Sequence, residues 1–198
     1  MDAREAFLAQ HALIHAKSIA PDGMFSYEDR LFEDLSETQL RTSPHGLNSV
    51  VWTLWHISRY EDLVVNLRLR GEPEIFDNGW SDRLGVDHRQ AGTGFGDDEV
   101  AALSECVNIV ALREYRAAVG RMTRDWIAHI DLETLDHRPD VRGRITDAAT
   151  LGVRAAWVTD FWEGKTVHEL LLVPVLSHAF IHYGEVSVTR SRLGGTTR

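Results

Sequence analysis

Apolar residues recur every three or four positions along most of this chain, a spacing typical of amphipathic helices. The alternation of apolar and polar residues that indicates strands is scarce. The segment 97–130 shows the helical pattern clearly, with apolar residues Val107, Val110, Tyr115, Val119, Met122 and Trp126. The sequence therefore predicts an all-α fold.

Turn-forming residues divide this pattern into four long helical segments, at about 3–19, 48–70, 97–130 and 166–193, with shorter pieces near 27–35 and 146–161. Asn48 or Ser49 is placed to cap the second long helix, and Gly71 follows its end. Pro174 lies within the last long helix and removes one backbone donor, which predicts a kink or a later start there.

A long polar connection, residues 71–97, joins the second and third long helices. A short loop joins only antiparallel neighbours, and long connections are often functional. We therefore expect an up-up-down-down four-helix bundle with short accessory helices. The 198 residues and 43% hydrophobic content suit a single domain over residues 1–195, followed by a flexible tail at 196–198.

Composition argues against several partners. A net charge of −9 does not favour nucleic acid, which requires a basic face. No run of about 18 apolar residues predicts a membrane span, and the first residues do not resemble a signal peptide. Cys106 is the only cysteine, so no internal disulfide can form. We expect Cys106 to be a small core residue. A cytoplasmic protein acting on a small molecule is the expectation, and exposed apolar helix faces hint at a homodimer.

Two histidines interrupt the apolar face of the last helix. His178 and His182 are four positions apart, so their side chains point the same way and can share a metal ion. Two histidines satisfied by ordinary hydrogen bonds are the alternative. His11 and His15 have the same spacing, but we expect their replacement to leave metal content unchanged.

His56 adds a third imidazole from a different long helix, on the face that also carries Trp52 and Leu63. Bundles build metal sites from side chains on facing helices. His56, His178 and His182 therefore predict a three-nitrogen site for a divalent cation with a position open to water or substrate. Zinc suits this ligand set best, while nickel, iron and manganese are also compatible with it.

Three blocks in order resemble the DinB-like (YfiT-related) family: WTLWHISRYED at 52–62, GWSDRLG at 79–85 and HAFIHYGEVSVTRSRLG at 178–194. The resemblance implies a four-helix bundle whose metal ligands map to His56, His178 and His182. It also implies a metal-dependent enzyme that uses a low-molecular-weight thiol such as bacillithiol, mycothiol or glutathione. Residues 131–165 add a helical stretch that shorter members lack.

The leading functional hypothesis is a thiol-dependent S-transferase acting on a small electrophile. Glu185 is a candidate acceptor for an imidazole N–H of the site, and Arg59 and Tyr183 are candidates for contact with an anionic substrate. A surface salt bridge is the alternative for Glu185 and Arg59, and simple packing is the alternative for Tyr183.

Two further hypotheses stay open at this point. A metal-activated hydrolase would use the same ligands and a general base, for which Glu61 and Asp62 are the nearest carboxylates in sequence. A non-enzymatic helical protein would keep the histidines as a structural or vestigial site.

Overall fold

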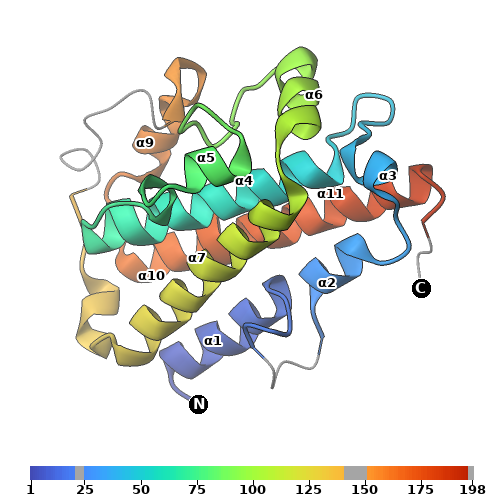
Figure 1. Cartoon of the computed structure of the whole chain (residues 1–198). Helices are drawn as coiled ribbons and strands as arrows, with labels where there is room; N and C mark the ends of the chain where they lie inside the picture. The colour runs from blue at the N-terminus through green and yellow to red at the C-terminus, as the bar shows by residue number, and fades with distance from the viewer. Residues whose placement is uncertain (21–24, 141–150, 196–198) are drawn as a thin grey trace.

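Four helical rods lie side by side in the computed structural model (Figure 1), which describes residues 1–20, 25–140 and 151–195. Within these ranges the chain forms helices and no strands, so the predicted all-α bundle is confirmed. The rods are α1 (Ala3–Ile14), α4 (Val50–Asp62) continued by the π-helical η1 (Leu63–Arg70), α7 (Ile109–His129), and the succession of α10 (Val167–Leu170), π-helical η5 (Leu171–Ser177) and α11 (His178–Arg192).

Shorter elements cover the connections between the rods. They are α2 (Tyr27–Phe32), α3 (Glu37–Arg41), η2 (Ile75–Asp77), α5 (Trp80–Leu84), α6 (Asp97–Cys106), η3 (Leu132–Asp136), η4 (Val153–Ala155) and α9 (Trp157–Trp162). The helix expected near 146–161 falls partly outside the described residues, as does the tail expected at 196–198.

Local capping explains most of the boundaries. The Ser49 hydroxyl accepts a hydrogen bond from the Trp52 amide at 2.9 Å and so begins α4. Gly71 ends η1 in the left-handed region, with φ of 70°, a conformation that glycine adopts at little cost. The predicted continuous segment 97–130 is wrong at one point: Val107 is extended, and Asn108 caps a separate helix by accepting from the Ala111 amide.

The directions of the rods follow from hydrogen bonds between them. Arg116 and Arg124 of α7 donate to the carbonyls of Ile14 and Leu8 in α1, so these helices are antiparallel. Side chains pair in the same order along α4–η1 and α7, which makes them parallel (Arg59 with Tyr115, Arg70 with Met122). Contacts from Thr189 to Asn48 and from His178 to His56 make α11 antiparallel to α4.

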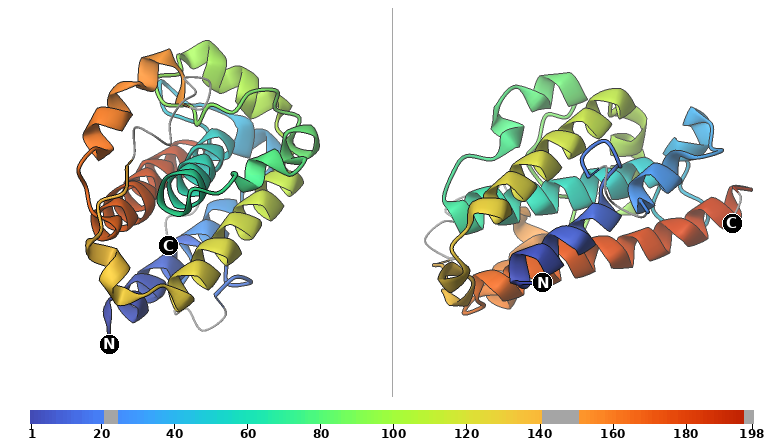
Figure 2. Two further views of the ribbon diagram at one scale, coloured as in Figure 1. Left: turned by 90° about the vertical axis from the view of Figure 1, so that its left-hand side faces the viewer. Right: turned by 90° about the horizontal axis from the view of Figure 1, so that it is seen from below.

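The bundle is therefore up-down-down-up and not the expected up-up-down-down. The long connection joins the second and third rods, and these two are the parallel pair that it serves. Figure 2 shows α4 and α11 side by side, with α7 on the other side of α4, and α1 packs against α7 and η5.

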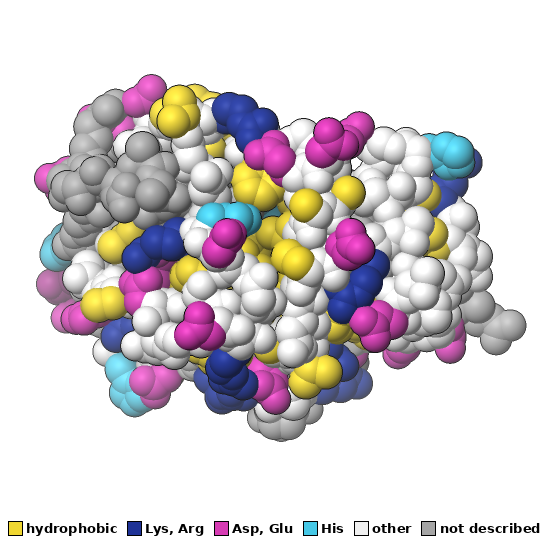
Figure 3. Space-filling view, turned by 45° about the horizontal axis from the view of Figure 1, so that its top comes forward, with side chains coloured by type: hydrophobic (Ala, Val, Ile, Leu, Met, Phe, Trp, Pro, Cys, Tyr) yellow, Lys and Arg dark blue, Asp and Glu magenta, His cyan; other side chains and the backbone are white. Residues whose placement is uncertain are grey.

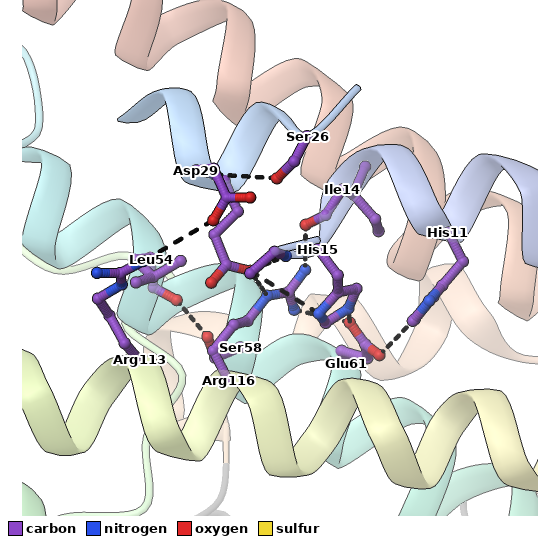
Figure 4. A network of polar contacts seen from close by, with 12 residues as sticks. His11, Ile14, His15, Ser26, Asp29, Leu54, Ser58, Glu61, Arg113 and Arg116 are labelled. Atoms are coloured by element: carbon purple, nitrogen blue, oxygen red, sulfur yellow. Dashed lines mark hydrogen bonds and ion pairs between the residues drawn. The ribbon is translucent and has the colours of Figure 1, made fainter. Parts of the chain in front are cut away.

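Every residue of α4 is buried, because α7, α11, α3 and α6 all pack against it. Its polar side chains therefore need partners inside the protein. Glu61 is one: it accepts from His11 at 2.9 Å, from His15 at 2.8 Å and from Arg116 at 2.7 Å. Figure 4 shows this network where α1, α4 and α7 meet. Glu28 of α2 lies 3.6 Å from the Arg116 guanidinium and completes it.

Burial sets the charges of this network. Desolvation lowers the pKa of His11 and holds that of His15 well below its usual value, so both rings are neutral. The neighbouring imidazoles and Arg116 hold the pKa of Glu61 well below its usual range despite its burial. Burial raises the pKa of Glu28 to about 7, and Arg116 only partly opposes it.

These shifts predict two opposing effects of pH on stability. Below pH 6.5, His11 and His15 bind protons in the unfolded chain but stay unprotonated in the folded protein. The free energy of unfolding therefore falls as pH falls. Between pH 7 and 4.5 folded Glu28 holds a proton that the unfolded chain lacks, so this residue stabilises as pH falls. Glu28→Gln removes the second effect alone. The variant should lose stability more steeply than wild type from pH 7 to 5, by up to about 1.4 kcal/mol per pH unit.

Urea unfolding of metal-free protein at several pH values measures this difference. Glu72→Gln, at an exposed position after η1, is the control and should keep the wild-type slope. Equal slopes for wild type and Glu28→Gln would show that Glu28 is ionised in the folded protein.

Candidate metal centre

His56, His178 and His182 meet between α4 and α11. The Nε2 atom of His178 lies 3.2 Å from Nε2 of His56 and 3.1 Å from Nε2 of His182. The three residues thus form a group able to hold a metal ion. Zinc–nitrogen bonds of about 2.0–2.1 Å at tetrahedral angles place nitrogens about 3.3–3.4 Å apart. The observed spacing is close to that value.

Hydrogen bonds at the other ring nitrogens fix two of the tautomers. His56 Nδ1 lies 2.6 Å from the Ala91 carbonyl, and His182 Nδ1 lies 2.7 Å from a Glu185 oxygen. A carbonyl and a carboxylate accept, so both Nδ1 atoms carry the proton and the neutral rings present bare lone pairs at Nε2. The predicted pairing of Glu185 with an imidazole is therefore present in the structure.

His178 faces both of these lone pairs. With a proton on Nε2 it donates to only one of them, and with a proton on Nδ1 three lone pairs face each other. Its Nδ1 is buried without a hydrogen-bond partner among the described residues. No protonation state of neutral His178 satisfies the group, whereas one cation would satisfy all three Nε2 atoms. The residues present fit a divalent metal ion.

Burial keeps the rings of His56 and His178 neutral. Desolvation lowers the pKa of His56 to about 3, although the bond to Ala91 partly opposes the shift. Burial and the two neighbouring imidazoles hold the pKa of His178 well below its usual value. Metal binding needs neutral imidazoles, so the site is prepared for a cation near neutral pH.

Aromatic rings and π-helical turns hold the histidines in place. Trp52 stacks on His56 with ring centroids 4.7 Å apart, and Tyr60 lies 4.2 Å from His178. His178 directly follows η5, the π-helical segment that contains Pro174. Proline has no N–H to donate, and π-helical turns often occur at functional sites. The kink predicted at Pro174 thus takes the form of a wider helical turn.

A cavity of about 470 Å³ opens beside His56 and His178. In the space-filling view of Figure 3, hydrophobic side chains gather near the middle of the face shown, and acidic and basic side chains surround them. The sequence did not single out most of its lining residues. Besides α4 and His178, the cavity is lined by the loop 92–95, by α9, and by Val173, Pro174, Ser177 and Ile181 of the last rod. The aromatic-rich run WVTDFW at 157–162 was the available signal.

Arg59 and Tyr183 lie elsewhere. Arg59 is fully buried and donates to Asp62, Tyr115, Glu74 and the Arg89 carbonyl, so its charge is already used. The Tyr183 hydroxyl donates to the Ile14 carbonyl at 2.6 Å. Neither residue is among the described residues that line the cavity. The structure gives no support to a substrate contact for either.

His11, His15 and Glu61 form a second group with metal-compatible spacing. Here both Nε2 atoms already face carboxylate oxygens, and Arg116 supplies a positive charge 2.7 Å from Glu61. This guanidinium takes the place that a cation would need. The group is therefore best described as a charge-paired part of the core, in line with the expectation that it is not part of the metal site.

Cys106 does not lie in the core as expected. It is exposed at the end of α6, because the helix stops before Val107 turns inward. Partial burial still raises the pKa of its thiol, and it is not among the described cavity residues.

One described helical stretch, Val167–Arg192, is long and apolar enough to cross a membrane by those two criteria alone. The sequence analysis did not single it out. In the structure this stretch is the fourth rod of the bundle, packed against α4 and α1, and core helices of bundles meet the same criteria.

The DinB superfamily model matches residues 28–186, a range that contains all three histidines of the centre. A crystal structure of a conserved protein from Enterococcus faecalis is similar over 99% of this chain and 99% of its own, with a TM-score of 0.65 and 19% identity. At that identity the similarity shows the fold alone. No curated protein matches the chain. Because the family model covers most of the sequence, this chain belongs to the DinB superfamily, as its three sequence blocks indicated.

Proposed function

We propose that this protein is a metal-dependent transferase that joins a low-molecular-weight thiol to a small electrophile. The observation that carries the proposal is the convergence of three imidazoles beside a cavity of about 470 Å³, with the Nε2 atom of His178 3.2 Å from that of His56 and 3.1 Å from that of His182. His56, His178 and His182 would hold a divalent ion, for which zinc is the first choice. A bound divalent ion stabilises the thiolate form of a thiol, which is the nucleophile.

In the proposed reaction a C–S bond forms between the thiol sulfur and the electrophilic carbon. The leaving group departs with its bonding pair, and the thiol proton passes to solvent. The chain supplies no cysteine to the described lining of the cavity, so the thiol must come from outside the protein. Trp52 packs against the ring of His56 and Tyr60 against that of His178.

A metal-activated hydrolase is the second candidate, but its expected general bases are engaged elsewhere. Asp62 accepts from Tyr115 and from the amides of Ile75 and Phe76. Glu61 accepts from His11, His15 and Arg116. Both carboxylates serve the buried core, and neither is among the described cavity residues. This observation favours the transferase.

The proposed use of a thiol also indicates the cellular compartment in which the protein works. A free thiol co-substrate requires a reducing compartment, which agrees with a cytoplasmic location. The small-molecule substrate and a homodimer belong to the same proposal.

Metal content tests the centre directly. Wild-type protein should carry about one equivalent of a divalent metal per chain, and His178→Ala should lose it, because two imidazoles on different helices hold an ion far less tightly than three. His129→Ala is the control, since the His129 side chain is 78% exposed on α7. Elemental analysis of the purified proteins gives the result. A metal-free wild type whose thermal stability is unchanged by chelation would support the non-enzymatic alternative.

Thiol dependence tests the reaction. Metal-loaded protein should conjugate 1-chloro-2,4-dinitrobenzene with glutathione, bacillithiol or mycothiol, with release of chloride, and His178→Ala should not. Product formation is followed by absorbance with and without thiol. Turnover of an ester or amide with no thiol present would instead support the hydrolase.

Glu185→Ala should weaken metal binding about 10- to 100-fold without unfolding the protein, because the carboxylate orients the His182 ring and half of its surface is exposed. Competition with a metal indicator measures the affinity. Glu114→Ala is a matched control, since Glu114 is also about half exposed and pairs with Arg83 far from the centre. Equal affinities for the two variants would remove Glu185 from the site.

A further inference from the structure

The cavity beside the metal centre is walled by aromatic rings. Apart from His56 and His178, the described residues that line it include no acidic or basic side chain. Its polar lining is limited to Asn48, Thr93 and Ser177, together with the glycines of the loop 92–95. Six aromatic side chains contribute to it: Trp52, Tyr60, Phe95, Trp157, Phe161 and Trp162.

The rings differ in exposure from the floor to the mouth of the cavity. Trp52, Tyr60 and Trp162 are at most 6% exposed and lie against the histidines or beside them. Trp157 and Phe161 of α9 are 59% and 50% exposed. Large aromatic side chains at the rim of a concave surface gain free energy when a ligand covers them. The mouth is therefore suited to an apolar body.

Charges near the rim are already engaged. Arg154 pairs with Glu99 and lies 6.0 Å over the ring of Phe95. Lys165 lies 5.1 Å over the ring of Phe161. A charged ligand group inside the cavity would lose its water and meet no opposite charge among the described lining residues. Aromatic rings attract cations, so a cationic ligand is one competitor. A divalent ion at the three histidines would repel a cation but would itself attract an anion, so the anion is tested on protein without metal.

We propose that the cavity selects an uncharged, flat aromatic substrate, with its reacting end at His56 and His178 and its ring system between α9 and Ile181. This inference rests on the proposed function and names the class of electrophile. It assigns Trp157 and Phe161 as residues that determine specificity.

Three unreactive probes that share one ring system test the charge preference: naphthalene-2-carboxamide, the 2-naphthylmethylammonium ion and naphthalene-2-sulfonate. Titration calorimetry with full-length protein compares the amide with the cation on metal-loaded protein. It compares the amide with the sulfonate after chelation, because a bound divalent ion would itself attract the sulfonate. We expect the neutral amide to bind at least ten-fold more tightly than either ion. A cation or anion that binds as tightly as the amide would overturn the proposal.

Variants at the mouth test the placement. Trp157→Ala and Phe161→Ala should each weaken amide binding at least five-fold, and because both rings are largely exposed, the fold should survive. Val153→Ala is the matched control: Val153 is 83% exposed in η4, close in sequence, and does not line the cavity. Unchanged binding in Trp157→Ala and Phe161→Ala would overturn the assignment.

The same titration after chelation separates the two proposals. Selective amide binding by a protein that never carries metal would support the cavity assignment and reject the metal-dependent transferase. Protein that carries metal as purified, but binds both ions as tightly as the amide in these two comparisons, would reject the substrate class and leave the metal centre standing.

Discussion

The complete burial of α4 is the constraint on which the rest of this structure depends. Its thirteen residues include histidine, arginine, glutamate and aspartate within seven positions, and none of these four is more than 4% exposed. Each of these polar groups needs a partner inside the protein. The neighbours of α4 are therefore fixed by chemistry as well as by shape. Glu61 binds Arg116 and the histidines of α1. Asp62 binds Tyr115 and the segment after η1, and His56 faces the histidines of α11.

The same constraint separates two histidine pairs that look alike in sequence. His11 and His15 donate from Nε2 to Glu61, and the Arg116 guanidinium balances the carboxylate charge. His178 and His182 turn Nε2 toward a third imidazole, and no positive charge balances the lone pairs. His11 and His15 therefore belong to a core network whose charges are balanced. His178 and His182, together with His56, leave a place that suits a cation. The residue opposite on α4 makes the difference, glutamate in one case and histidine in the other.

The sequence was informative where a pattern is local. Helical spacing predicted the rods, a capping residue at 48 or 49 predicted the start of α4, and His56 could be matched with the pair His178 and His182 on the last helix. Relations across the bundle were less accessible. The direction of the rods was misjudged because the long connection joins the second and third rods and so favours a parallel pair there, whereas an up-up-down-down order makes these two rods antiparallel. Arg59 looked available to a substrate, but its burial depends on Glu74 and Tyr115, which lie 15 and 56 positions away. Cys106 is exposed because Asn108 restarts the helix, a local cap inside what reads as one continuous pattern.

The contrast between the cavity and its proposed co-substrate constrains how the two reactants can bind. Thiols such as glutathione carry charged groups, and burying these against Trp157, Phe161 and Trp162 would leave them without partners. The aromatic cavity therefore suits the electrophile alone. His182 is not among the described cavity residues, and its partner Glu185 is half exposed, so the centre has a second, more polar side away from the rings. On the proposed function, only the sulfur of the thiol reaches the three histidines, and its charged part stays in water. The electrophile and the thiol then meet from opposite sides of one centre, which brings a C–S bond-forming pair together without placing a charge in the apolar cavity.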